Sequence, residues 1–170
     1  MKIKLANISD IPQIMEVISD AKNLLKQSGS LQWNTDSYPN EETFINDINN
    51  QVLYALWDNT TLVGIVACIN GIDENYKQIK GHWIANGPYL SIHRIAIRKE
   101  YYHTKSSHIL IDYAINLAKS LDCISIKVDT HPLNIPMQKL LLHFNFTYCG
   151  IIELLRSNID NKRLAYELIL

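Results

Sequence analysis

The sequence predicts a mixed α/β fold, in which a twisted, mostly antiparallel sheet contains a central parallel β-α-β crossover and carries helices on both faces. Apolar residues recur at helical spacing in some segments and alternate at strand spacing in others. A strand, a helix and a second strand follow one another over residues 89–129, which is typical of a right-handed parallel crossover. The 170 residues suit one unit, so we expect a single domain over residues 1–170.

Local signals define the individual elements. Ser9 and Asp10 offer a helix N-cap, and apolar residues repeat every three or four positions over 11–27. The polar break at Asp58-Asn59 separates two β-rich runs and predicts a hairpin, and the long loop 71–89 is of a length that is more often functional than idle. We expect strands at 2–6, 52–57, 62–70, 89–98, 123–129, 146–154 and 162–169, and helices at 11–27, 41–50, 105–121 and 136–144.

Composition and charge exclude several function classes. The formal net charge of -1 argues against nucleic acid as a partner, because such domains usually carry a basic surplus. No apolar run approaches the roughly 20 residues that span a bilayer, and the N-terminus lacks a signal-peptide core, so we expect a cytoplasmic protein without a membrane partner. The three cysteines and six histidines show no metal-ligand spacing, so no metal site is expected.

Ligands of open α/β sheets collect beyond the carboxyl ends of parallel strands, near helix N-termini. In this chain those positions are the loop Lys99–Thr104, the helix start at Lys105 and the segment Thr130–Asn134. The exposed amides of a helix N-terminus bind anions. A ligand that carries phosphate is therefore the natural candidate.

Two stretches resemble a known family. The run IHRIAIRKEYYHTKSSHILIDYAINLAK resembles the central motif of the GNAT superfamily of acyl-CoA-dependent N-acetyltransferases, and DTHPLNIPMQKLLLHFNFTYCGII resembles the strand-helix-strand signature that follows it. The predicted element order is also that of the family. The pairs Gln32-Trp33 and Tyr38-Pro39 resemble a bacterial subgroup of these enzymes.

The resemblance implies acetyl-CoA as the acyl-donor cosubstrate. It implies that the strand Arg94–Ile97 holds the pantetheine arm through its backbone, that the loop Tyr102–Ser107 cradles the pyrophosphate, and that Asn134 touches the CoA arm. The implied cofactor-binding residues are Ile95, Ala96, Ile97, Tyr102, His103, Thr104, Lys105, Ser106, Ser107 and Asn134.

The pyrophosphate loop departs from the family pattern Q/R-x-x-G-x-G/A. Tyr102 replaces the leading Arg or Gln, Lys105 replaces the first glycine, and Ser107 alone keeps the small character. A left-handed conformation forced on Lys105 would cost roughly 1–2 kcal/mol. Its charge suits a phosphate, although the side chain can equally point into water. A second departure is Leu141, which replaces a tyrosine that protonates the leaving thiolate in many GNAT enzymes.

Two histidines are candidates for the general base, which typically accelerates such a step by about 10²–10⁴. His131 follows a central strand, and His93 lies in the strand that would flank the thioester. The alternatives are a loop histidine bonded to backbone for His131 and a core histidine for His93. The expected acceptor-binding residues are loop side chains that either overhang the cleft or cap the core: Gln32, Trp33, Tyr38, Trp83 and Tyr89.

The expected function is transfer of an acetyl group from acetyl-CoA to a primary amine of a small molecule or peptide, by direct attack on the thioester. The altered loop and Leu141 leave open a non-catalytic GNAT-fold module that binds CoA or regulates another protein. An unrelated α/β enzyme for a phosphorylated metabolite is a third alternative. The oligomeric state is open, with a homodimer as one option.

Overall fold

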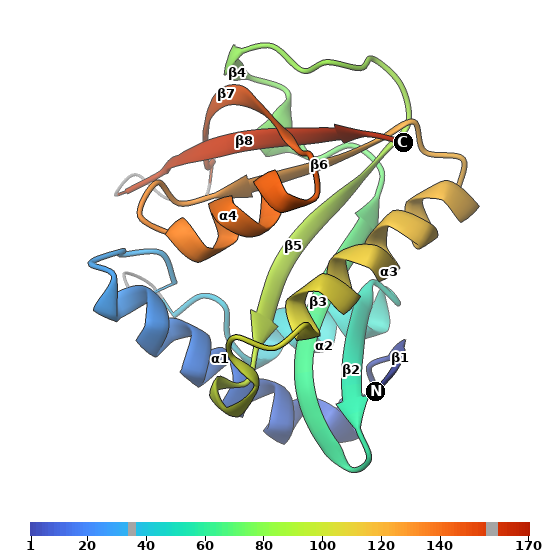
Figure 1. Cartoon of the computed structure of the whole chain (residues 1–170), viewed down its shortest axis with the longest axis vertical. Helices are drawn as coiled ribbons and strands as arrows, with labels where there is room; N and C mark the ends of the chain where they lie inside the picture. Colours follow the sequence, from blue (N-terminus) through green and yellow to red (C-terminus); the bar gives the residue numbers. More distant parts are fainter. Residues whose placement is uncertain (34–36, 156–159) are drawn as a thin grey trace. The chain divides into compact units, whose positions relative to one another are not determined.

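A computed structural model describes residues 1–33, 37–155 and 160–170 of the chain (Figure 1). The helices and strands predicted from the sequence are present with shifts of one or two residues at their ends. The strands are β1 (Lys2–Leu5), β2 (Leu53–Asp58), β3 (Thr61–Asn70), β4 (Ile79–Gly81), β5 (Tyr89–Ile97), β6 (Ser125–Thr130), β7 (Thr147–Glu153) and β8 (Lys162–Ile169), and the α-helices are α1 (Ile11–Gln27), α2 (Glu41–Asn49), α3 (Ser106–Ser120) and α4 (Ile135–His143).

The eight strands follow the order β1-β2-β3-β5-β6-β8-β7-β4. β5 and β6 pair in parallel from Tyr89↔Ser125 to Ile92↔Val128. The pairs β1–β2, β2–β3, β4–β7, β6–β8 and β7–β8 are antiparallel. The predicted fold class, a mostly antiparallel α/β sheet with one parallel crossover, is therefore confirmed.

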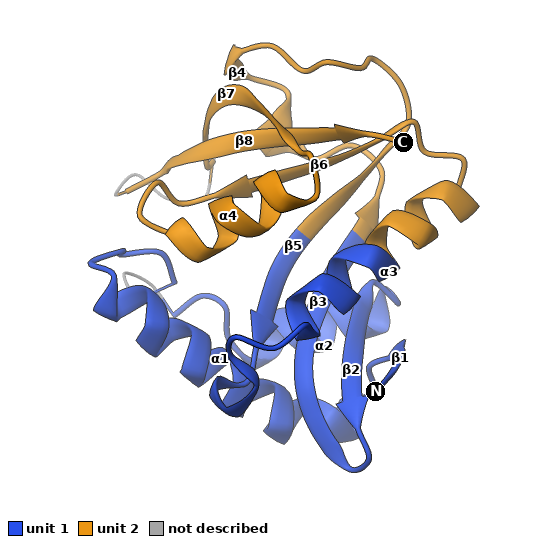
Figure 2. Ribbon diagram, viewed as in Figure 1, with its two compact units in different colours: residues 1–68, 93–113 blue, residues 69–92, 114–170 orange. Residues whose placement is uncertain are grey.

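The chain divides into two compact units (Figure 2). Unit 1 comprises residues 1–68 and 93–113, and unit 2 comprises residues 69–92 and 114–170. The division falls within β3, β5 and α3, so each of these elements contributes residues to both units. None of the helices in the described part of the chain combines the length and hydropathy of a membrane span.

The core of unit 1 lies between β2–β3 and the helices α1 and α2. Ile14 of α1, Phe44 of α2 and Ile65 of β3 are completely buried in one apolar cluster. α2 begins where the Asn40 side chain accepts a hydrogen bond from the amide of Thr43, a capping box that satisfies the helix end. The amphipathic periodicity of the two helices thus serves to cover one face of the strands.

The sheet of unit 2 brings two glycines into direct backbone contact. Gly81 of β4 pairs with Gly150 of β7, and both have a positive φ, of 137° and 140°. A Cβ atom on Gly150 would lie 2.3 Å from the carbonyl oxygen of Lys80, so a side chain cannot be accommodated there without separating the strands. The short strand β4 within the predicted loop 71–89 therefore depends on these two residues, and it was not predicted.

Candidate functional site

The loop that joins β5 to α3 contains the left-handed residue at a different position from the one considered above. His103 has φ 61°, whereas Lys105 is not among the residues with positive φ. Tyr102 before it is extended, with φ −61° and ψ 150°. A histidine tolerates left-handed geometry better than a β-branched residue does, and the cost expected at Lys105 does not arise.

Three backbone amides of this loop are available to an anion. Among the described residues, the N–H groups of His103, Lys105 and Ser107 have no hydrogen-bond acceptor. The amide of Ser106 is different, because it donates to the hydroxyl of Thr104 at 3.3 Å. The available amides flank the N-terminus of α3, where the helix dipole favours negative charge.

The start of the same loop is fastened to the rest of unit 1. The amide of Lys99 donates to Asp20 of α1 at 3.0 Å, and the Tyr101 hydroxyl donates to Asp58 of β2 at 3.2 Å. Arg98 donates to the carbonyl of Leu62 at 2.8 Å. Burial raises the pKa of Tyr102, whose ring is half-buried. The anchored residues fix where the amides of His103–Ser107 lie, while the side chains of His103 and Lys105 remain exposed.

The strand residues expected to hold the pantetheine arm lie beside a glycine. A Cβ atom placed on Gly64 of β3 would be 2.7 Å from the carbonyl oxygen of Ala96 and 2.6 Å from Cδ1 of Ile97. The absence of a side chain therefore lets β5 approach β3 closely at the segment Ile95–Ile97. Ala96 itself is buried, with 5% of its surface exposed.

Replacement of Gly64 by alanine is expected to lower the free energy of unfolding by about 1–3 kcal/mol, because β5 must shift to make room for the methyl group. The measurement is urea unfolding followed by circular dichroism. The comparison is Gly71→Ala, where an added Cβ meets nothing within 4 Å. Any loss of stability in that variant measures the strain of the positive φ alone, without a steric clash. A fully stable Gly64→Ala variant would contradict the close approach of the two strands.

Arg94 lies within β5 and has a left-handed backbone conformation, φ 49°. Such a conformation costs a non-glycine residue about 1–3 kcal/mol, so surrounding contacts must hold it. Its guanidinium donates to both carboxylate oxygens of Asp47 on α2, at 2.6 and 2.9 Å, and to the Tyr38 hydroxyl at 2.9 Å. Burial raises the pKa of the Asp47 carboxyl, while the charge of Arg94 opposes that rise.

The two candidate bases differ in what surrounds them. In His131, Nδ1 accepts a hydrogen bond from the amide of Leu133 at 3.0 Å, which places the proton of the neutral ring on Nε2, 2.9 Å from Asp160. Both ring nitrogens are therefore engaged, and the geometry matches the alternative of a loop histidine bonded to backbone. His93 lies next to Arg94 on β5, near enough to Asp47 for its charge to lower the pKa of that carboxyl.

Asn134, expected to touch the CoA arm, caps α4 in unit 2. Its side-chain oxygen accepts a hydrogen bond from the amide of Met137 at 3.2 Å. The side-chain amide nitrogen of Asn134 is a donor that the cap does not use. Leu141 on the same helix is completely buried, so its side chain contributes to packing.

The aromatic residues expected to bind the acceptor fall into two groups. In unit 1, Trp33 packs against the apolar core and Tyr38 contacts Arg94, while the backbone amide of Gln32 donates to Ser30. In unit 2, the rings of Trp83 and Tyr89 lie next to the ammonium of Lys127. Trp33, Trp83 and Tyr89 also pack against core clusters of their own units. A role of the five residues in acceptor binding stays a prediction.

A buried polar cluster in unit 2 was not predicted. The Nζ of Lys127 lies 4.5 Å from the ring centre of Trp83 and 4.1 Å from that of Tyr89. Glu167, directly paired with Lys127 across β6 and β8, is completely buried and accepts hydrogen bonds from the amides of Ile84 and Ala85 at 2.5 and 3.3 Å. Burial lowers the pKa of Lys127, and Glu167 opposes that change. The sequence feature that could have indicated this cluster is Lys127, a charged residue inside the apolar run CISIKVD.

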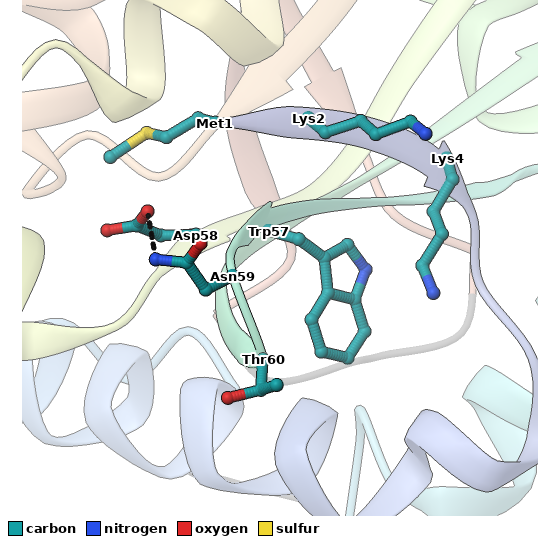
Figure 3. Close-up of a pocket in the computed structure, with 7 residues that line it drawn as sticks. All are labelled: Met1, Lys2, Lys4, Trp57, Asp58, Asn59 and Thr60. Atoms are coloured by element: carbon teal, nitrogen blue, oxygen red, sulfur yellow. Dashed lines mark hydrogen bonds between the residues drawn. The ribbon is translucent and has the colours of Figure 1, made fainter.

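A pocket of about 630 Å³ lies elsewhere, at the edge of unit 1 formed by β1 and the β2–β3 turn (Figure 3). Lys4 extends over the ring of Trp57, with Nζ 4.5 Å from the ring centre. No predicted site residue is among the seven described residues that line it, which are Met1, Lys2, Lys4, Trp57, Asp58, Asn59 and Thr60.

The three cysteines are buried and have free thiols. Burial raises the pKa of Cys68 to about 12 and also raises the pKa values of Cys123 and Cys149. Because the thiolate is the reactive form, we expect the native protein to leave 5,5′-dithiobis(2-nitrobenzoic acid) unreacted at pH 7 and the unfolded protein to titrate three thiols. Rapid reaction of the native protein would show that one of these side chains is accessible.

Comparison with known proteins gives a consistent family. The model of the acetyltransferase (GNAT) family matches residues 18–146. A GNAT-family acetyltransferase from Streptococcus agalactiae is 31% identical, with a TM-score of 0.86 over 99% of this chain and 95% of that one. No curated protein matches the sequence.

More distant solved structures share the fold. PaiA N-acetyltransferase from Thermoplasma acidophilum, solved in complex with coenzyme A, is 16% identical, with a TM-score of 0.72 over 99% of this chain and 98% of that one. A ribosomal-protein-alanine N-acetyltransferase from Brucella melitensis is 14% identical, with a TM-score of 0.72 over the whole of both chains.

Proposed function

Because the chain belongs to the GNAT acetyltransferase family, we propose that it transfers an acetyl group from acetyl-CoA to a primary amine of a small molecule or peptide. The observation that carries this proposal is the set of available amides at His103, Lys105 and Ser107, at the N-terminus of α3. They supply the donors that a diphosphate needs even though the loop lacks the family glycine. The coenzyme A complex of the PaiA enzyme, which has the same fold, also supports the choice of cosubstrate.

In the proposed reaction, the lone pair of the amine attacks the thioester carbon, the C–S bond breaks, and CoA leaves as a thiolate. The backbone of Ile95–Ile97 would align the thioester, and the amides and charge of Lys105 and its neighbours would hold the pyrophosphate. A lysine-like amine with a pKa of about 10.4 costs roughly 4.6 kcal/mol to deprotonate at pH 7, so a base is useful. His93 is the base that we favour, because it lies in β5, the strand that would flank the thioester.

The departing thiolate has no tyrosine acid in α4, since Leu141 occupies that position in the core. A free thiol has a pKa near 8.5, so water can protonate the thiolate without a dedicated residue. Catalysis therefore does not require a general acid from the protein, and we assign none. A cytoplasmic location and a homodimer are further parts of the proposal that remain predictions.

The same two departures favour a second candidate, a GNAT-fold module that binds CoA without catalysis. It shares the phosphate-binding loop with the enzyme but needs no base, acid or acceptor site. The lysine at position 105 and Leu141 are the observations in its favour. The two candidates differ in turnover and not in binding.

The test has two stages. Thermal unfolding is first followed with increasing acetyl-CoA, and at 100 times the dissociation constant the protein should gain about 2.7 kcal/mol of stability. Thiol release is then measured against a panel of small amines and peptide N-termini. Stabilisation with turnover supports the enzyme, stabilisation without turnover supports the module, and no stabilisation at millimolar acetyl-CoA excludes both.

A further inference from the structure

We propose that Asp47 is a positioning residue for the strand that would hold the pantetheine arm. Its carboxylate holds the Arg94 side chain, and through that side chain it holds the left-handed turn in β5 that precedes Ile95–Ile97. This inference rests on the proposed function, because it concerns how the cosubstrate strand is kept in shape. All the residues involved belong to unit 1.

The contact between Asp47 and Arg94 has the geometry of a strong, specific interaction. Nε and one terminal nitrogen of the guanidinium donate to separate oxygens of the carboxylate, at 2.6 and 2.9 Å. Each side chain keeps only 11% of its surface exposed. Planar pairing of this kind fixes orientation as well as distance, and solvent screens it less than it screens a surface pair.

A third hydrogen bond comes from a different segment. The other terminal nitrogen of Arg94 donates to the Tyr38 hydroxyl at 2.9 Å, and Tyr38 precedes α2 in the chain. The guanidinium is thus held by one residue from α2 and one from the segment before it. A side chain held from two directions cannot rotate without breaking one of these contacts.

The position of this contact in β5 gives it a consequence for the cosubstrate. The parallel ladder between β5 and β6 ends at Ile92, two residues before Arg94. Beyond that point β5 keeps β3 as its neighbour in the sheet. The direction of the following peptide groups also depends on the backbone angles at Arg94, which are unfavourable for an unrestrained arginine. Relaxation of Arg94 would therefore rotate the peptides of Ile95–Ile97, which are those expected to run beside the pantetheine.

The experiment compares CoA binding by four variants with the wild-type protein, using isothermal titration calorimetry. In Asp47→Asn the pair loses its charge and one of its two acceptors, and we expect the dissociation constant for CoA to rise about tenfold, which corresponds to 1.4 kcal/mol. In Asp47→Glu the carboxylate returns on a longer stem and should recover part of the affinity. In Tyr38→Phe one hydrogen bond is lost, and a rise of about threefold is expected.

The matched control is Ile14→Val, a substitution in the core of unit 1 that lowers stability and removes no polar group. Its dissociation constant should remain within twofold of the wild-type value. Amide hydrogen exchange of residues 93–97 without ligand should be faster in Asp47→Asn than in this control. That readout separates a positioning role from a general loss of stability.

Each outcome has a clear meaning. If folded Asp47→Asn and Tyr38→Phe bind CoA as the wild-type protein does, Asp47 has no positioning role, and the proposed function stands. If affinity falls equally in the Ile14→Val control, the effect reflects stability alone and the inference is wrong. If the wild-type protein binds no CoA at all, the proposed function is wrong, and the inference, which rests on it, is wrong too.

Discussion

Replacement of Lys105 by glutamate is expected to weaken CoA binding about 100-fold. The side chain is exposed at the N-terminus of α3, beside the available amides of His103 and Ser107. A charge-assisted hydrogen bond to phosphate contributes about 1.5–3 kcal/mol, and the reversed charge would add repulsion to its loss. The dissociation constant measured by calorimetry at low salt checks this prediction, because salt screens the exposed charges.

The control for that substitution is Lys119→Glu, which makes the same change of net charge in the last turn of α3. It should alter the CoA dissociation constant less than threefold. Equal losses in the two variants would mean that net charge, and not the loop, determines binding. An unchanged affinity in Lys105→Glu would mean that this lysine points into water in the complex.

Replacement of Glu167 by leucine is expected to lower the free energy of unfolding by about 3–5 kcal/mol. The carboxylate is completely buried, it accepts hydrogen bonds from the amides of Ile84 and Ala85, and it faces the buried ammonium of Lys127 across the ladder. Its removal leaves those donors and a buried charge uncompensated. For a chain of this size the melting temperature should fall by roughly 6–20 °C, measured by calorimetry.

A double-mutant cycle identifies the cause of that loss. With methionine at position 127, the buried ammonium is absent, so Glu167→Leu should cost at least 1 kcal/mol less in the Lys127→Met background than in the wild type. Additive losses would show that Lys127 does not depend on Glu167. Glu167→Gln retains one acceptor for the two amides and should be milder than the leucine variant.

The sequence predicted the fold well because each main element has a local signal. The apolar spacing of 11–27 and the polar break at Asp58-Asn59 are local features of the sequence. β4 could not be predicted, since its three residues are a strand only through pairing with β7 at Gly150, which lies far along the chain. The identity of the left-handed residue in the loop before α3 was missed for a similar reason, because φ at His103 depends on how Lys99–Tyr101 are anchored.

The contacts of the candidate site residues were harder to predict from the sequence than the fold. The ring nitrogens of His131 are engaged by Leu133, two residues away, and by Asp160, and only the first of these contacts is local. The contact of the Trp83 and Tyr89 rings with Lys127, on a separate strand, was not predicted. Contacts between side chains on different strands join residues that are far apart in the sequence. They therefore produce no local pattern from which they could be predicted.

Titration of the ¹⁵N-labelled protein with CoA, followed in ¹H–¹⁵N correlation spectra, tests directly whether the loop before α3 holds the pyrophosphate. The amide signals of His103, Lys105 and Ser107 should shift with CoA and should not shift with pantetheine, which has no diphosphate. Unchanged signals for these three amides at saturating CoA would contradict the proposed site, whatever the remaining spectrum shows.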